Sequence, residues 1–386
     1  MVLLLAAAAP ADGDLSVSVA IMPGMRDLSL RTLNRTLLVR QHLAARTDLS
    51  PYELIRHLVA VQGQEPNWPY IGVWSRLGRF DHPELAALMH DRKLVRSTTI
   101  RRTVHLSTAE DFRWLRPTVQ AYIAGALNTA YYRDEIDGIE LSELAAAGRE
   151  VLAGRWMSRG DLGKSLAERF PQRHARRLAE AVEVLVPMAH GAETGEWGRW
   201  RNRYVTVGPA EEWIGAPLGQ ADPSTLVRRY LAAFGPASVA DIQAWSGLTR
   251  LGEVVTTLRP RLRVLRSAEG AELFDLPDAP LADPELPVPV RFLPAFDNAL
   301  LGYRDRRRII AEEDRRRTSR EASAGVPVYL VDGFVHGRWS LQDATLRIEP
   351  WYGFAAGQWT LVEEEARRLL AFVSDGGAGD IVVVGR

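Results

Sequence analysis

The strongest constraint on the fold is an order of elements that the chain shows three times: helical segments followed by a pair of strands. Apolar residues that recur every three or four positions indicate the helices, and short runs that alternate apolar with polar residues indicate the strands. Helices followed by a strand pair is the order of a winged helix. We therefore expect an α+β fold with three tandem winged-helix units of about 70 residues or somewhat more.

The first winged-helix unit is expected within residues 26–135. It begins with LNRTLLVRQHLAAR, whose leucines form an apolar stripe, and continues with a helix that Ser50 and Pro51 should cap. PYIGVWSRL and HPELAALMHDR predict two further short helices. LVRSTTIRRTVHLS is rich in β-branched residues and predicts the strand pair.

The second unit is expected within residues 136–215 and the third within residues 220–280. Each contains three segments with helical periodicity before its strand pair. In the second unit GEWGRWRNRYVTV predicts a two-stranded wing with a turn near Gly198. In the third unit LRVLRSAEGAELFDLP predicts a hairpin that turns at Gly270.

A small β-rich domain is expected to close the protein over residues 285–386. The proline-rich span of residues 275–292 interrupts the periodicity before it. VPVYLVDGFVHGRWSL predicts two strands joined by a tight turn at Asp332 and Gly333, and one helix is expected near residues 361–372.

The N-terminal residues 1–25 are expected to be a disordered leader, with a cleaved signal peptide as the alternative, since MVLLLAAAAP has an apolar run without a preceding basic residue. No later run is long enough to span a bilayer. The chain has no cysteine, which excludes disulfides and thiolate metal sites and fits a reducing cytoplasm. The eight histidines are scattered without metal-ligand spacing, so we expect no metal and no cofactor. We expect a cytoplasmic monomer.

The charge is balanced at 48 basic and 48 acidic residues, so binding to nucleic acid would depend on a local patch. One candidate is the second wing, which interleaves aromatic and basic side chains. In this wing the candidate DNA contacts are Trp197, Arg199, Trp200, Arg201 and Arg203. Strand alternation would separate the arginines from Trp200, so that aromatics press on bases while arginines bind phosphates. The alternative is that the aromatics cover the core and the arginines are only solvated.

A second candidate patch is the arginine-rich run from Tyr303 to Arg320, in which Arg306, Arg307 and Arg308 are the candidate DNA contacts. Acidic residues within the same run can neutralise much of its charge. The alternative is therefore an ordinary charged surface.

The stretch VQGQEP places two neutral amides, Gln62 and Gln64, on either side of one glycine. In an extended segment such residues point to one side, whereas a helix would separate them, so we expect the motif at a helix end. The alternative is that the amides cap the helix or bind loop backbone. Glu65 is a candidate electrostatic partner or capping residue. His105, on the predicted strand pair, is a second candidate site residue, and the alternatives for it are a hydrogen-bonded structural role or a phosphate contact.

Five separated blocks resemble the AlkZ/YcaQ-like winged-helix DNA glycosylases, in the order of that family. They are QGQEP, PYIGVWSRL, RRTVHLS, RFLPAFDNALLGYRDRRRII and VYLVDGFVHGRWSL. The resemblance covers residues 26–386. The family's catalytic motif is a glutamine, an apolar residue and then glutamine or aspartate. The resemblance places it on Gln62 and Gln64, although Gly63 replaces the apolar residue and gives the backbone more freedom.

The resemblance implies a monofunctional glycosylase that removes N7- or N3-alkylated purines from double-stranded DNA, including nucleotides in interstrand crosslinks. It also implies that some members protect producers of DNA-alkylating antibiotics such as azinomycin B. A glutamine is a poor base but can orient water and stabilise an oxocarbenium-like sugar, which suits bases that are already cationic. The alternatives are a non-enzymatic winged-helix DNA-binding regulator and a resistance protein that sequesters a drug.

Overall fold

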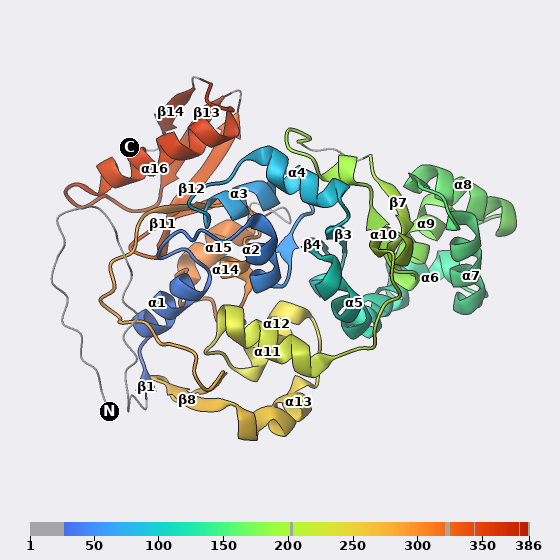
Figure 1. The fold of residues 1–386 in the computed structure, drawn as a ribbon, viewed down its shortest axis with the longest axis horizontal. Coiled ribbons are helices and arrows are strands. Elements are labelled where there is room, and N and C mark those ends of the chain that lie inside the picture. Colours follow the sequence, from blue (N-terminus) through green and yellow to red (C-terminus); the bar gives the residue numbers. More distant parts are fainter. Residues whose placement is uncertain (1–26, 201–203, 321–324, 343, 378, 385–386) are drawn as a thin grey trace.

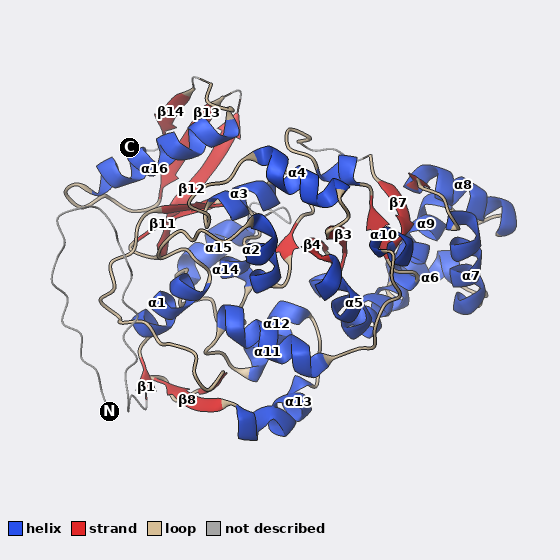
Figure 2. Ribbon diagram, viewed as in Figure 1, coloured by secondary structure: helices blue, strands red, loops and turns tan. Residues whose placement is uncertain are grey.

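The computed structural model describes residues 27–200, 204–320, 325–342, 344–377 and 379–384. Figure 1 shows residues 51–108 at the centre of the molecule, with the following helical region at one end and the C-terminal sheet toward the other. Helices and small separate sheets alternate along the chain (Figure 2). The predicted mixture of helix and sheet is confirmed.

Three segments share one order of elements: a helix, a short strand or bridge, two helices and a hairpin. We call residues 51–108 the first repeat, 141–209 the second and 223–275 the third. The first repeat contains α2 (Pro51–Leu58), β2 (Val61–Gln62), α3 (Trp68–Trp74), α4 (His82–His90), β3 (Leu94–Thr98) and β4 (Val104–Thr108), with sheet order β2-β4-β3. The second contains α7 (Leu141–Leu152), β5 (Met157–Ser158), α8 (Arg159–Arg169), α9 (Ala175–Leu185), β6 (Met188–His190) and β7 (Thr206–Pro209), with sheet order β5-β7-β6.

The third repeat has the same arrangement with a reduced first strand. It contains α11 (Pro223–Phe234), α12 (Val239–Ser246), α13 (Leu251–Leu258), β8 (Arg263–Ser267) and β9 (Glu272–Asp275). Ala237 forms a single antiparallel bridge with Phe274 of β9, in the place of the first strand. On the other side of β8, the strand β1 (Asp27–Leu28) pairs in parallel and leads into α1 (Leu30–Arg40).

The C-terminal part of the chain contains a five-stranded sheet whose strands follow chain order. They are β10 (Arg291–Leu293), β11 (Val328–Val331), β12 (Phe334–Gln342), β13 (Thr345–Pro350) and β14 (Asp380–Val383). The last pair is parallel, and α16 (Gln358–Val373) connects its two strands. The segments α14 (Asn298–Leu301) and α15 (Glu312–Arg320) lie between β10 and β11.

Local sequence signals account for several element boundaries. The side chain of Ser50 accepts a hydrogen bond from the Glu53 amide and the Glu53 carboxylate returns one to Ser50, so α2 starts where its cap was predicted. Gly270 has a φ of 87° and Gly333 a φ of 80°, as the two predicted tight turns require.

Two features differ from the sequence predictions. The helices α5 (Ala109–Ala124) and α6 (Ala130–Ile136) follow the first repeat and were not predicted, and α5 has Pro117 in its interior, where proline normally disfavours a helix. The predicted turn near Gly198 is present, since Gly198 lies in a turn and has a φ of 86°, but the strands of the second wing are placed differently: β6 ends at His190 and β7 begins at Thr206, with a 3-10 turn (Ala192–Gly195) between them. Residues 196–200 are therefore loop, and the strand alternation expected there does not apply to them.

Buried ion pairs join segments that are distant in sequence. Arg76, just after α3, binds Asp297, which caps α14, through two hydrogen bonds of 2.7 and 2.9 Å. Arg40 of α1 binds Asp275 of β9 through two contacts of 2.7 Å. Because these pairs are almost fully buried, removing one partner leaves an uncompensated charge in the interior.

We predict that Asp297→Asn lowers the free energy of unfolding by about 3 kcal/mol, because Arg76 loses its buried counter-charge. Urea denaturation followed by circular dichroism measures this loss. Asp278→Asn makes the same chemical change at an exposed position and should shift stability by less than about 0.5 kcal/mol. Equal effects of the two substitutions would contradict the prediction.

Candidate active site

The glutamine motif lies between two elements of the first repeat. Helix α2 ends at Leu58, strand β2 covers Val61 and Gln62, and the chain bends at Gln64. The motif thus follows a helix end as predicted, and Gln62 is extended, but Gln64 lies beyond the strand. Gln62 pairs with His105 of β4 in the antiparallel ladder.

The two amide side chains have different surroundings. Gln62 is only 5% exposed, and its Oε1 accepts a long hydrogen bond of 3.4 Å from the backbone N–H of Gln64. Gln64 is exposed and lines a cavity of about 420 Å³ between the first and second repeats. One glutamine is therefore held in the protein interior, while the other faces a space that a ligand can enter.

The backbone at Gly63 is fixed although the residue is glycine. Its N–H donates to the carbonyl of Val104 at 2.8 Å, which extends the β2 ladder by one residue. A Cβ at this position would lie 3.4 Å from Cγ of Pro69, an ordinary contact, so the surroundings also admit the apolar residue expected from the family motif. The carbonyl of Gly63 accepts a hydrogen bond from Arg96.

Arg96 is a site residue that the sequence analysis missed. It lies on β3, is 6% exposed, and its Nε donates to the Gly63 carbonyl at 3.0 Å, with a longer contact of 3.5 Å to the carbonyl of Gln64. Its Nη1 contacts both Nδ1 of His190 and Oγ1 of Thr194 at 3.1 Å. Burial lowers the pKa of Arg96 to about 10, so it remains a cation at neutral pH. The one signal in the sequence was an arginine inside a β-branched, apolar strand.

The contacts of Arg96 continue into a buried charge network of the second repeat. Glu183 accepts hydrogen bonds from Arg159 at 2.7 and 2.8 Å and contacts Nε2 of His190 at 3.0 Å. Because Arg96 can only donate, Nδ1 of His190 is an acceptor. Nε2 therefore carries the proton that Glu183 binds at 3.0 Å, and the longer contact of 3.3 Å between Nε2 and Arg159 is not a hydrogen bond in this tautomer. Burial lowers the pKa of His190 to about 4. Burial opposes the ionisation of Glu183, but Arg159 and His190 bring its pKa well below the usual range.

His105 lies next to Gln62 across the ladder but is fully buried. Its Nδ1 donates to the carbonyl of Thr103 at 2.8 Å, while its Nε2 has no hydrogen-bond partner in the described part of the chain. Burial, together with the nearby charge of Arg101, lowers the pKa of His105 to about 3. His105 is therefore neutral at physiological pH and can only accept through Nε2.

Glu65 and the Trp-Arg loop (residues 196–200) are linked through Asn67, the residue immediately before α3. Oε1 of Glu65 accepts from Nδ2 of Asn67 at 3.0 Å, and Oδ1 of Asn67 accepts from the backbone N–H of Gly198 at 2.8 Å. This loop of the second repeat is thereby attached to the segment that follows the glutamine motif. Glu65 positions Asn67 in this arrangement.

The candidate DNA contacts of the second wing differ in their exposure and in their contacts within the protein. Trp197 is partly buried and stacks on His82, with 4.1 Å between ring centroids. Trp200 is 38% exposed and meets Trp68 edge to face at 5.3 Å. Arg199 is exposed and forms an ion pair with Glu196 at 3.1 Å. The candidates Arg201 and Arg203 lie outside the described residues.

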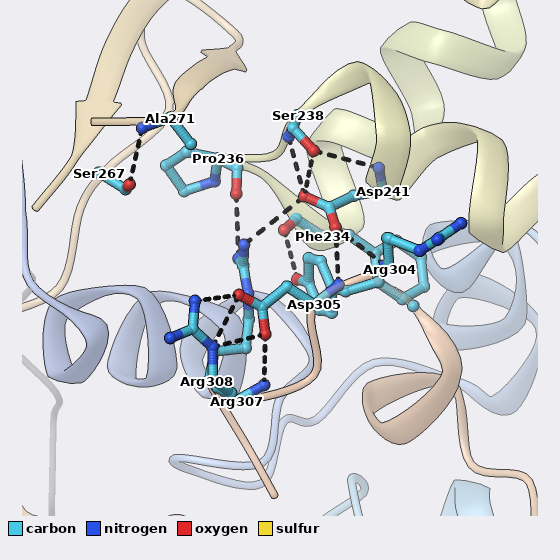
Figure 3. A network of polar contacts seen from close by, with 12 residues as sticks. Phe234, Pro236, Ser238, Asp241, Ser267, Ala271, Arg304, Asp305, Arg307 and Arg308 are labelled. Atoms are coloured by element: carbon cyan, nitrogen blue, oxygen red, sulfur yellow. Dashed lines mark hydrogen bonds and ion pairs between the residues drawn. The ribbon is translucent and has the colours of Figure 1, made fainter. Parts of the chain in front are cut away.

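Only some side chains of the second arginine patch lie on the protein surface. Arg308 is 5% exposed, lies 3.7 Å from the ring centroid of Tyr303 and donates to the carbonyl of Pro236 at 3.0 Å, close to Asp241 (Figure 3). The expectation of an exposed DNA contact at Arg308 is therefore wrong, because its guanidinium is used inside the protein. Arg307 is exposed and paired with Asp305, and Arg306 is partly buried.

Within the described ranges no group of three or more histidine, aspartate or glutamate side chains is arranged to hold a metal ion. No helix in the same ranges is long and apolar enough to cross a membrane. The polar groups around the cavity are instead arginines, glutamates, glutamine and histidine. Such a lining can orient water, bind polar groups of a ligand and stabilise charge.

Known proteins resemble this chain in sequence and in fold. A family model described as AlkZ-like DNA glycosylase matches residues 55–372. A relative from Streptomyces sahachiroi, named an interstrand DNA cross-link repair glycosylase, is 26% identical over 344 aligned residues, and the match covers 81% of this chain and 87% of that protein. The solved structure of the Streptomyces sahachiroi DNA glycosylase AlkZ has a TM-score of 0.78 at 23% identity and covers 93% of this chain and 100% of its own.

The neutral state of His190 predicts an acid-sensitive fold. Because its pKa lies near 4 in the folded chain and near 6.5 in the unfolded chain, its contribution to stability is complete above pH 6.5 and is lost as the pH falls toward 4. His190→Gln should keep both hydrogen bonds and reduce the stability lost between pH 7 and 5 by about 2 kcal/mol. Urea denaturation at a series of pH values measures this. The exposed His174→Gln should retain the wild-type pH dependence, and an unchanged profile in His190→Gln would contradict the assignment.

Proposed function

Because the chain belongs to the AlkZ-like DNA glycosylase family, we propose that it hydrolyses the N-glycosidic bond of cationic N7- or N3-alkylated purines in double-stranded DNA. The observation that carries this proposal is the position of the Gln motif. Gln64 lines the cavity between the first and second repeats, and the backbone of Gly63 and Gln64 is held by a buried arginine. The amides of Gln62 and Gln64 orient the attacking water and stabilise the oxocarbenium-like sugar.

The partners of the two cavity carboxylates support the proposal that the substrate is cationic before the enzyme acts. Glu183 is ionised and bound by Arg159 and His190, and Glu180 forms an ion pair with Arg176 at 2.8 Å. Both carboxylates are thus engaged within the protein, and ionised Glu183 cannot protonate a neutral leaving group. An N7-alkylguanine already carries a positive charge and leaves as a neutral base, so it needs little protonation. Neutral lesions such as uracil should be poor substrates.

We also propose that the three repeats are winged-helix units that contact the duplex. In each repeat the first strand or bridge pairs with the last strand, so the hairpin lies beside a three-helix group. That arrangement offers a helix to the major groove and a hairpin to the minor groove or backbone. The relative's name supports crosslinks among the substrates. Monofunctional action as a cytoplasmic monomer, and a role in resistance to a DNA-alkylating antibiotic, belong to the same proposal.

The first test is base release from a duplex that carries one N7-methylguanine. We predict that Gln62→Ala and Gln64→Ala each lower the single-turnover rate by about 100-fold, because each removes an oriented dipole from the transition state. Gln220→Ala, at an exposed position outside the cavity, is the matched control. DNA affinity and thermal unfolding are measured for all variants, so that loss of fold is distinguished from loss of chemistry.

The alternatives give other outcomes in the same assay. A regulator would bind one preferred sequence without leaving abasic sites, and a sequestering protein would bind the drug without DNA. Absence of base release by the wild-type chain on both small and bulky adducts would reject the glycosylase proposal.

The Trp-Arg loop yields a second prediction for DNA binding. Trp200→Ala should weaken binding to lesion DNA by about 10-fold, because an exposed indole that contacts Trp68, shortly after the motif in the chain, can stack on a base or fill the duplex near the lesion. Trp197→Ala should mainly lower the unfolding temperature, since that ring packs on His82. Fluorescence anisotropy and thermal denaturation separate the two effects. Equal DNA affinities of Trp200→Ala and wild type would remove Trp200 from the interface.

A further inference from the structure

The cavity beside Gln64 is larger than a methyl substituent requires. Its volume of about 420 Å³ falls in the range of ~300–1,000 Å³ that is usual for pockets that bind small organic molecules. Its lining combines apolar side chains, among them Val104, Ile123 and Val205, with Tyr132 and several charged residues. A ligand with an apolar stem and a polar end matches this combination.

The charged residues of the lining are mostly basic. The cavity contacts four arginines and two glutamates, namely Arg96, Arg102, Arg159, Arg176, Glu180 and Glu183. Both glutamates are already occupied by partners within the protein. Glu183 binds Arg159 and His190, and Glu180 accepts from Arg176 at 2.8 Å and from the hydroxyl of Tyr131 at 2.8 Å. The carboxylates therefore present little free negative charge to a ligand.

Two of the arginines are not paired with a carboxylate. Arg96 uses its donors on the carbonyl of Gly63, on Thr194 and on neutral His190. Arg102, in the turn between β3 and β4, is exposed, donates through Nε to the carbonyl of Tyr122 at 2.9 Å and stacks 4.4 Å from that ring. No carboxylate of the described residues lies in an ion pair with Arg102, and its terminal nitrogens remain able to donate.

The chemistry of the lesion connects this cavity with the Gln motif. In a purine, N7 and the glycosidic N9 belong to the same five-membered ring and are separated by one carbon. A substituent on N7 therefore starts close to the bond that Gln62 and Gln64 act on, if the proposed function holds. Since Gln64 lines the cavity, the substituent has this space beside it.

We propose that the cavity between the first and second repeats binds the N7 substituent of the lesion and prefers substituents that end in anionic or hydrogen-bond-accepting oxygen atoms, with Arg102 as the specificity-determining residue. This inference rests on the proposed glycosylase function. Selectivity then arises from the excess of unpaired guanidinium groups, which attract an acceptor and repel an ammonium group.

Four duplexes of identical sequence test the proposal, each with a single N7-alkylated guanine. Three substituents differ in charge at similar size: carboxymethyl is anionic, carbamoylmethyl is neutral and 2-aminoethyl is cationic. N7-methylguanine is the reference. Single-turnover base release is corrected for the spontaneous depurination of each duplex and divided by the rate for the methyl lesion. The carboxymethyl lesion should be released about 10-fold faster than the aminoethyl lesion, with the carbamoylmethyl lesion between them.

Substitutions of Arg102 then assign the preference. Arg102→Gln should bring the ratio of carboxymethyl to aminoethyl release close to 1, and Arg102→Glu should bring it below 1. Arg367→Glu is the matched control, because it makes the same change in charge at an exposed residue of α16 that does not line the cavity, and it should keep the wild-type ratio. Circular dichroism and thermal unfolding verify that the variants are folded, and Arg102→Gln suffices if Arg102→Glu is unstable.

The outcomes separate the inference from the function on which it rests. Release of N7-methylguanine with equal rates for the three charged and neutral substituents, or with a preference for aminoethyl, overturns the inference and leaves the glycosylase intact. A preference that survives both Arg102 substitutions overturns the role of Arg102. Failure to release any of the four bases rejects the proposed function itself.

Discussion

The contact between Arg96 and the backbone of the Gln motif joins the two halves of the candidate site. One guanidinium binds the carbonyl of Gly63 in the first repeat and contacts His190 and Thr194 in the second. The orientation of Gln64 in the cavity is thus coupled to His190 and Thr194, about 130 positions later in the chain. A buried arginine is costly to desolvate, and this one is retained where its five rigid donors can hold the segment that follows β2.

The same network determines which chemistry the site can support. His190 is neutral and fixed in one tautomer, and Glu183 is ionised and fully engaged. His105, beside Gln62, is buried and neutral as well. With its titratable groups committed in this way, the site is better suited to orienting water and stabilising positive charge than to protonating a leaving group. This arrangement favours substrates that already carry the positive charge, which is the physical basis of the proposed specificity for alkylated purines.

Each candidate DNA-binding patch contains residues that pack inside the protein and residues that remain exposed. Trp197 and Trp200 are three positions apart, yet one stacks on His82 and the other remains exposed beside Trp68. Arg308 lies inside the protein, where its charge faces Tyr303 and Asp241, while the adjacent Arg307 is on the surface. Composition alone could not distinguish them, because aromatic and arginine side chains serve equally well in a core contact and in a DNA interface.

The sequence by itself determined the threefold order of helices followed by a strand pair, together with the cap at Ser50 and the turn at Gly333, since periodicity, capping and turn preference act between neighbouring residues. The motif at Gln62 and Gln64 was also visible in the sequence, through its resemblance to a family. Only the tertiary structure decided that Arg96 holds this motif and that Gln64 faces a cavity shared with the second repeat. Those contacts join residues far apart in the chain, and they depend on how the repeats pack, which no local pattern encodes.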